Sequence, residues 1–116
     1  TLMSNPEAVW IQKETLFRDK PLYQKIAGEV KSSGADGLVI GTTDHVTEQD
    51  IREVRGLSGE DVVFLCPGVG AQGGDVEKIL GNAGDNVLIN VGRMIINDKE
   101  PEVKAKEFRD LINGFR

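Results

Sequence analysis

The chain has 116 residues and a mass of 12.6 kDa, which suffices for one domain with a single modest core. Its net charge of −5, from 14 Lys and Arg against 19 Asp and Glu, excludes a nucleic-acid partner held by bulk positive charge. A local site for a small anion remains compatible with that charge. Cys66 is the one cysteine, which excludes an internal disulfide and predicts a reducing, cytoplasmic setting. No apolar run approaches the roughly 18 residues of a membrane span, so we expect no membrane partner.

Three short apolar segments, rich in β-branched residues, predict buried parallel strands at residues 37–41, 61–66 and 86–91. Residues 1–4 are predicted to be the end of a fourth strand, because Pro6 soon afterwards favours a change from extended chain to helix.

Helical spacing of apolar residues predicts helices that alternate with these strands. The helices span residues 21–33, 47 onward, 75–80 and 101–115, with Asp75 as an N-cap. In the last of them, the apolar side chains expected to face a core are Val103, Phe108, Leu111 and Ile112. The polar stretch 12–20 predicts a loop or an irregular helix end.

Strict alternation of buried strands and helices predicts an α/β fold made of βα units on a parallel sheet. Four such units amount to half of a (β/α)8 TIM barrel, for which about 250 residues is typical. A small flavodoxin-like sheet is the other architecture that fits. We treat residues 1–116 as a single half-barrel domain, since no linker or internal repeat divides the chain.

A glycine-rich loop at residues 67–74 is the strongest local signal for a binding site. It follows a buried strand and precedes a helix, at the sheet edge where α/β proteins bind ligands. Pro67, Gly68, Val69 and Gly70 form its first half, and glycines there allow backbone N–H groups to face an anion. Gln72 adds an amide that can both donate and accept hydrogen bonds. A flexible connection ending in a helix cap is the alternative.

The next strand ends in Gly92 and Arg93, and an arginine at this position can present a fork of N–H donors to a phosphate. Neighbouring strands that end in a glycine-rich loop and in Gly-Arg resemble the phosphate site of many barrels. At the end of the first strand, Ser4 and Asn5 are candidates for hydrogen bonds to a ligand. They are equally candidates for the N-cap ahead of Pro6.

The remaining polar and aromatic residues have simpler interpretations. Residues 42–44 are expected to cap the following helix, and His45 is expected to be a surface side chain because no metal-binding cluster surrounds it. Cys66, Trp10 and Tyr23 are expected to be packing residues. Nothing in the sequence forms a nucleophile–base pair or a carboxylate dyad, so the chain offers no catalytic residues and no metal ligands of its own.

Together these motifs resemble the C-terminal half of the orotidine 5'-monophosphate decarboxylase family, from its fifth to its eighth βα unit. The resemblance is carried by residues 67–74 followed by 91–93, and it extends over nearly the whole chain. Residues 3–6 look like the family's fifth-strand motif, and residues 37–43 look like its sixth strand. Residues 20–23 are similar to the longer bacterial and archaeal branch of the family.

This resemblance implies a barrel enzyme of pyrimidine biosynthesis that converts orotidine 5'-monophosphate to UMP and carbon dioxide without metal or cofactor. In the family, the serine matching Ser4 contacts the pyrimidine ring, and the pair matching Gly92 and Arg93 holds the phosphate. The glutamine matching Gln72 spans the phosphate and the base from a closing loop. Orotidine 5'-monophosphate or UMP is therefore the expected ligand.

The sequence departs from the family in one large respect. The family's catalytic Lys-Asp-Lys-Asp array comes from its first three strands, which have no counterpart here, so we expect no decarboxylation by the isolated chain. The chain begins at what looks like the end of a strand, as if a preceding half had been removed or were encoded elsewhere. Four βα units would leave one uncovered sheet face and two open edges. The expected remedy is association with an N-terminal half-barrel or with itself as a homodimer.

Three other interpretations stay open at this point. The chain could be a non-catalytic module that binds a nucleotide or phosphate, or a folded fragment without activity. Other phosphate-binding barrels, which act on sugar phosphates, share the glycine loop and the Gly-Arg pair but have less claim on the loop that contains Gln72.

Overall fold

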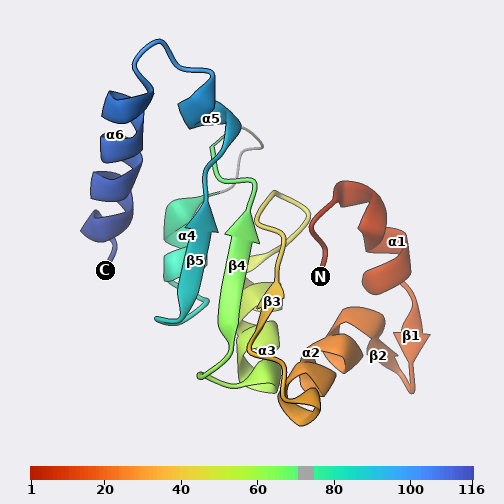
Figure 1. Cartoon of the computed structure of the whole chain (residues 1–116). Coiled ribbons are helices and arrows are strands. Elements are labelled where there is room, and N and C mark those ends of the chain that lie inside the picture. Colours follow the sequence, from red (N-terminus) through yellow and green to blue (C-terminus); the bar gives the residue numbers. More distant parts are fainter. Residues whose placement is uncertain (71–74) are drawn as a thin grey trace.

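The computed structural model describes residues 1–70 and 75–116, and its centre is a parallel sheet (Figure 1). Within these residues the sheet has the order β3-β4-β5, with β3 at Gly37–Val39, β4 at Val63–Pro67 and β5 at Val87–Asn90. All pairs are parallel, which confirms the predicted βα architecture. The predicted fourth strand at residues 1–4 is reduced to one parallel bridge between Leu2 and Ile40.

The larger helices lie where the apolar spacing predicted them. They are α2 (Leu22–Ser33), α3 (Glu48–Ser58), α4 (Val76–Leu80) and α6 (Pro101–Gly114). Short elements complete the described chain, namely η1 (Pro6–Ala8), α1 (Val9–Gln12), β1 (Leu16–Phe17), β2 (Lys20–Pro21) and α5 (Arg93–Ile96). Residues 12–20 were predicted to be a loop or an irregular helix end; α1 does end at Gln12, but the small antiparallel hairpin of β1 and β2 that follows was not predicted. The helix α5 was not predicted, because four residues are too few to show a helical period.

Local side-chain chemistry explains where two of the helices begin. Thr47 precedes α3 and forms a capping box with Asp50: each side chain accepts a hydrogen bond from the other residue's backbone N–H. This arrangement corrects the prediction that residues 42–44 cap the helix. Asp75 precedes α4 and accepts hydrogen bonds from the backbone of Glu77 and Lys78, as predicted for an N-cap.

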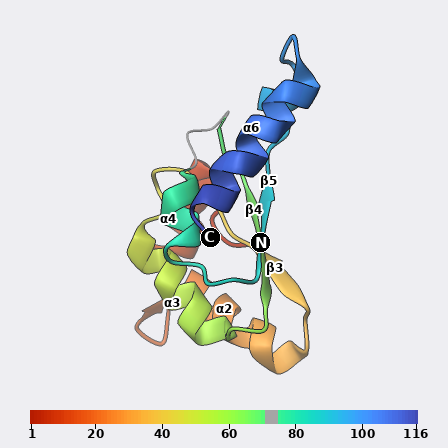
Figure 2. The same ribbon diagram turned by 90° about the vertical axis from the view of Figure 1, so that its left-hand side faces the viewer.

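The sheet is covered on one face only by the residues described. Figure 2 shows α3 and α4 to one side of the strands, and that face carries a buried row of Leu38, Phe64 and Val87 in register. The opposite face carries a second row in register, formed by Val39, Leu65 and Leu88. On this face Leu65 is 36% exposed and Leu88 is 59% exposed. The strands are apolar on both faces, as expected of a sheet that is buried on both sides in a complete barrel.

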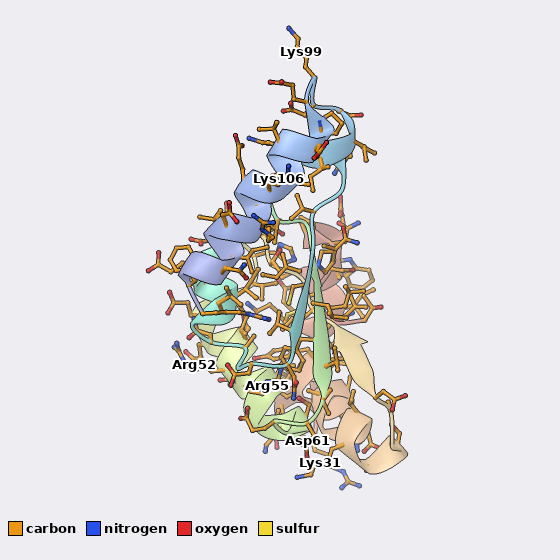
Figure 3. All side chains as sticks on the ribbon, turned by 60° about the vertical axis from the view of Figure 1, so that its left-hand side comes forward. Lys31, Arg52, Arg55, Asp61, Lys99 and Lys106 are labelled. Carbon is orange, nitrogen blue, oxygen red and sulfur yellow. The ribbon has the colours of Figure 1, made fainter. Side chains whose placement is uncertain are left out.

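A buried arginine, Arg55, packs against the core at the amino ends of the strands. The Arg55 guanidinium stacks 3.6 Å from the centre of the Phe64 ring. Its nitrogens donate to the carbonyls of Ala83 at 2.6 Å and Val62 at 2.7 Å. Figure 3 shows Arg55 in the lower part of the molecule, toward Asp61 and Lys31, and Lys99, beyond α5, at the opposite end. The polar end formed by Arg55 is therefore structural and lies away from the glycine-rich loop.

Two predictions of buried side chains, one for α1 and one for α6, were wrong. In both helices no neighbouring element of the described chain covers the side chains concerned. Trp10 is 64% exposed on α1, whereas Tyr23 is buried as predicted between α2 and α3. In α6, only Phe108 and Ile112 pack against the core, while Val103 and Leu111 are exposed. In residues 1–70 and 75–116, no helix has both the length and the apolarity that crossing a membrane requires.

Candidate functional site at the carboxyl edge of the sheet

The register of the sheet brings the predicted phosphate-binding segments to one edge. Pro67, the last residue of β4, lies opposite Asn90, the last residue of β5. Because the two strands are parallel, the chain leaves both of them on the same side of the sheet. The glycine-rich loop and the Gly92-Arg93 pair therefore start side by side.

Gly70 confirms that the two segments are in contact. A Cβ atom at this position would lie 3.0 Å from Met94 Cγ and 3.2 Å from Phe108 Cζ, so the loop backbone packs against the residue that follows Arg93. The φ angle of Gly70 is +79°, a conformation that side-chain-bearing residues rarely adopt. Between the loop glycines, Val69 is buried and anchors the loop to the core. The other predicted loop residue, Gln72, lies outside the described residues.

Arg93 is exposed at the first position of α5, directly after Gly92. Among the described residues, no hydrogen bond or ion pair involves its guanidinium. The side chain lies at the edge where the glycine loop begins.

A second part of the same edge is an open cleft of about 560 Å³. It is lined by Ser4, Asn5 and Pro6 from one side and by residues 43–45 from the other. The structure shows the capping role for one residue of the first pair: Asn5 Oδ1 accepts a hydrogen bond from the backbone N–H of Glu7 and caps η1. Ser4 is exposed and lines the cleft. Unlike Asn5, it does not cap η1.

Close backbone contact holds the chain that leads into Ser4. The Met3 carbonyl oxygen lies only 1.8 Å from where a Cβ atom on residue 41 would be, so Gly41 is required for this approach. Backbone hydrogen bonds run from Leu2 N–H to Val39 O at 2.6 Å and from Gly41 N–H to Leu2 O at 2.8 Å. Met3 itself has a φ of +46°, a left-handed conformation that costs a non-glycine residue about 1 to 2 kcal/mol. Ser4 is therefore presented from a rigid and strained segment.

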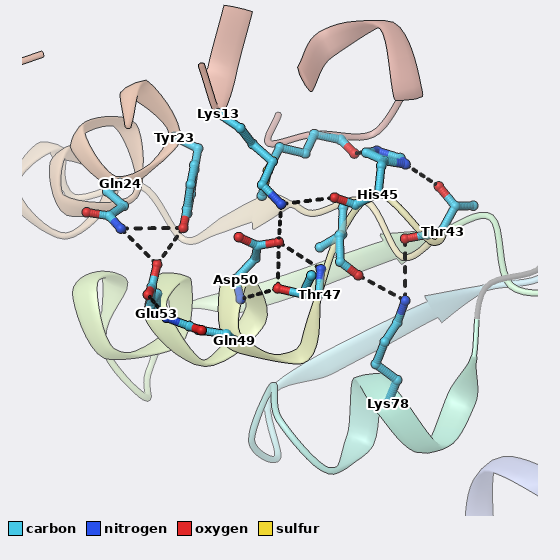
Figure 4. A network of polar contacts seen from close by, with 12 residues as sticks. Lys13, Tyr23, Gln24, Thr43, His45, Thr47, Gln49, Asp50, Glu53 and Lys78 are labelled. Atoms are coloured by element: carbon cyan, nitrogen blue, oxygen red, sulfur yellow. Dashed lines mark hydrogen bonds and ion pairs between the residues drawn. The ribbon is translucent and has the colours of Figure 1, made fainter. Parts of the chain in front are cut away.

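Two lysines from different elements fix the loop after β3 (Figure 4). Lys13 Nζ donates to the carbonyl of His45 at 3.1 Å and to Asp50 Oδ2 at 2.6 Å. Lys78 Nζ, from α4, donates to the carbonyls of Val46 at 3.0 Å and Thr43 at 3.4 Å. The loop that forms one wall of the cleft is thus anchored on both sides.

Lys13 also sets the charge state of Asp50. Burial alone raises the pKa of this carboxyl, but the hydrogen bonds from Lys13 and Thr47 outweigh it and hold the pKa below its ordinary value. The carboxylate is thus ionised at neutral pH. It connects the start of α3 to the chain segment that follows α1.

Thr42 links the cleft to the glycine loop. Its buried hydroxyl donates to the carbonyl of Pro67 at 2.6 Å, which ties the chain after β3 to the end of β4. The cleft at Ser4 and the contact of Gly70 with Met94 are consequently two parts of one sheet edge. Within residues 1–70 and 75–116, no cluster of three or more side chains suited to a metal ion is present.

Three residues of this site were not predicted as such. His45 was expected to be a surface side chain, but it lines the cleft and bonds to the Met3 carbonyl. Gln12 and Lys13 were predicted to belong to a polar loop or helix end with no role in a site, yet Gln12 contacts Met3 and Lys13 contacts His45. The available signal was position: His45 follows the end of a predicted strand closely, at the edge where ligand contacts gather.

A parallel sheet with one apolar face open and its loops gathered at the carboxyl edge defines the chain as half of a βα barrel. Comparison with known proteins agrees: the model of the orotidine 5'-phosphate decarboxylase / HUMPS family matches residues 1–108. The orotidine 5'-phosphate decarboxylase of Bordetella petrii is 36% identical over 129 residues, covering 97% of this chain and 46% of that protein.

Solved structures give the same result. The structure of Leishmania donovani UMP synthase has a TM-score of 0.82 and 31% identity, covering 98% of this chain and 27% of that one. The orotidine 5'-monophosphate decarboxylase of Methanocaldococcus jannaschii, complexed with inhibitor BMP, has a TM-score of 0.74 and 26% identity, covering 97% and 46%. The chain belongs to the orotidine 5'-phosphate decarboxylase / HUMPS family. It spans about half the length of the curated relatives it matches, as predicted for a C-terminal half.

Proposed function

We propose that this chain is the substrate- and phosphate-binding half of an orotidine 5'-phosphate decarboxylase, which converts orotidine 5'-monophosphate to UMP and carbon dioxide. The observation that carries the proposal is the contact between the glycine-rich loop and the start of α5. Gly70 packs against Met94, next to Arg93, at the carboxyl edge of the sheet. One of the solved structures similar to this chain is a decarboxylase complexed with an inhibitor.

The phosphate of the nucleotide would bind between the two segments. Arg93 would supply a charged fork of N–H donors, which suits a phosphate better than a single ammonium group does. Gly92 and the loop residues from Pro67 to Gly70 would bring backbone close to the phosphate oxygens, because no Cβ stands in the way at the glycines. This assignment is supported by the exposure of Arg93 and its place beside the loop.

The pyrimidine end of the nucleotide would lie toward the cleft. Ser4 would contact the base with its hydroxyl, and Asn5 would line the same wall while its side-chain oxygen caps η1. Thr42 keeps this cleft in a fixed relation to the glycine loop through its bond to Pro67. Gln72 would bridge phosphate and base, as the family resemblance implies.

The isolated chain would bind and not decarboxylate, because the family's lysine–aspartate array has no counterpart in it. The open sheet face with Leu65 and Leu88 would receive the N-terminal half-barrel that carries this array, since apolar area of this kind is stabilised by burial. Reaction in the cytoplasm, without metal or cofactor, is part of the same proposal. The exposed face also admits a second copy of the chain, which would make a binding module without catalysis.

Isothermal titration with UMP tests the proposal, with Arg93→Ala beside the wild type and Arg52→Ala as the matched control. Arg52 is an exposed arginine of α3 that bonds to Glu48 and Asn82. Loss of a charged bidentate contact typically costs about 1.5 to 3 kcal/mol, so we expect Arg93→Ala to raise the Kd roughly 10- to 100-fold. Arg52→Ala should leave the Kd unchanged. Equal affinities for wild type and Arg93→Ala would contradict the phosphate assignment.

Adding the N-terminal half of a family member tests the division of labour, with decarboxylation assayed on orotidine 5'-monophosphate and affinity measured by the UMP titration. We expect decarboxylation to appear only in the mixture. A mixture with neither activity nor improved UMP affinity would contradict the role of a binding half. If the chain alone binds UMP as a stable dimer and the added half changes nothing, the non-catalytic module is the better description.

A further inference from the structure

We propose that His45 is a positioning residue that orients Ser4 toward the base of the bound nucleotide, acting through the backbone of Met3. The inference rests on the proposed function for the identity of the ligand. His45 is a residue to which the family resemblance assigns no role. The inference also predicts separately that His45 affects binding of the base and not of the phosphate.

The imidazole of His45 is held at both nitrogens (Figure 4). Nε2 lies 2.7 Å from the carbonyl oxygen of Met3, and Nδ1 lies 2.9 Å from the hydroxyl of Thr43. A carbonyl oxygen only accepts hydrogen bonds, so Nε2 must be the donor. The Thr43 hydroxyl then donates to Nδ1. Because both ring nitrogens have a partner, the orientation of the ring is fixed.

Met3 is therefore clamped through both of its backbone polar groups. Its carbonyl accepts from His45, and its N–H donates to Gln12 Oε1 at 2.9 Å. Gln12 comes from α1, and His45 comes from the loop after β3. A non-glycine residue at a φ of +46° persists only where its surroundings over-determine the conformation, and the two side chains provide that constraint.

Ser4 follows directly, so the direction of its side chain depends on the Met3 carbonyl being held. His45 is itself fixed, because Lys13 binds its carbonyl and Lys78 binds the carbonyls of Thr43 and Val46. The histidine thus transmits the position of an anchored loop to the opposite wall of the cleft. Groups that must meet a ligand within a fraction of an ångström need such support.

The test compares His45→Asn with His45→Gln, because the two amides divide the functions of the ring. The amide nitrogen of asparagine reaches the position of Nδ1 and keeps a contact with Thr43, whereas that of glutamine reaches the position of Nε2 and can still donate to Met3. Each variant is titrated with UMP and with ribose 5-phosphate, which has the phosphate but no base.

We expect His45→Asn to weaken UMP binding about five- to tenfold, as loss of one hydrogen bond does. Ribose 5-phosphate binding should stay unchanged, and His45→Gln should stay within about twofold of the wild type for both ligands. Equal losses for the two ligands, or equal behaviour of the two variants, would overturn the inference. Absence of binding of either ligand to the wild type would instead contradict the proposed function.

Amide hydrogen exchange decides the positioning role even if no ligand binds. His45→Asn should accelerate exchange of the Met3 amide, which lies in the clamped segment, and of the Gly41 amide, which donates to Leu2 O in that segment; His45→Gln should not. The Phe64 amide, which donates to Asn86 O at the amino end of the sheet, is the internal control. Unchanged exchange at Met3 in His45→Asn would show that the histidine does not hold this segment.

Discussion

Gly41→Ala is the sharpest single perturbation of the edge that carries the site. The added methyl group would lie 1.8 Å from Met3 O, 2.7 Å from Met3 C and 3.1 Å from Ser4 Cα. All three are backbone atoms, so no side-chain rotation relieves the overlap. The segment at residues 2–4 must move away by more than about 1 Å to reach an ordinary contact distance.

The magnitude follows from the bonds that such a shift breaks. The hydrogen bonds at stake run from Gly41 N–H to Leu2 O at 2.8 Å, from Leu2 N–H to Val39 O at 2.6 Å, and from His45 Nε2 to Met3 O at 2.7 Å. At roughly 1 kcal/mol each, their loss lowers the free energy of unfolding by about 3 kcal/mol. Partial exposure of Leu2 and Met3, both fully buried, adds to this. The lower backbone entropy of alanine in the unfolded chain offsets about 0.4 to 1 kcal/mol.

Urea denaturation followed by far-UV circular dichroism measures this change, and Gly28→Ala is the matched control. Gly28 lies inside α2 with no atom within 4 Å of its added Cβ, so the same substitution should raise the free energy of unfolding by up to about 1 kcal/mol. Glycine-to-alanine substitution is thus expected to lower the free energy of unfolding at position 41 and to raise it at position 28. A loss below about 1 kcal/mol in Gly41→Ala would refute the reasoning that this segment is held by the close backbone approach.

Two further predictions concern titratable groups. Because its bonds to Lys13 and Thr47 lower the pKa of Asp50, that carboxylate stabilises the fold fully above its unfolded pKa of about 3.9 and loses the contribution as pH falls through the lower folded value. Acid unfolding curves of Asp50→Asn should lack this part of the pH dependence, and an unchanged curve would contradict it. Burial raises the pKa of Cys66 to about 12, against the opposing effect of Arg55. The native thiol should therefore resist a disulfide reagent at neutral pH and react only on unfolding in urea, whereas rapid native labelling would show the core to be open.

Elements whose signals are local in the sequence were predicted well. The cap at Asp75 and the apolar spacing of α2 depend on residues within a few positions of one another, so they can be identified without knowledge of the fold. The hairpin of β1 and β2 was missed because two-residue strands show no period. Trp10 was misassigned because an aromatic side chain gives no local indication of whether a neighbouring element covers it.

The candidate site divides in the same way. The glycine-rich loop and the Gly92-Arg93 pair were predicted as partners because parallel strands place the loops that follow them at one edge, which is a consequence of topology. The division of roles between Ser4 and Asn5 stayed open in the sequence, since both residue types cap helices and bind ligands. In the structure the backbone N–H of Glu7 donates to Asn5, which identifies Asn5 as the cap, and the contact of Ser4 with the base stays a proposal.

The sequence by itself determined the alternation of strands and helices and the family, and it predicted the edge of the sheet at which we propose that a ligand binds. These properties follow from hydrophobic spacing, capping and motifs, which are read along the chain. Only the tertiary structure decided that His45, 42 residues after Met3, reaches its carbonyl, and that Gln12 accepts a hydrogen bond from its N–H. Such contacts depend on strand register and on how the connecting loops are anchored, because those set which distant side chains come within hydrogen-bond distance.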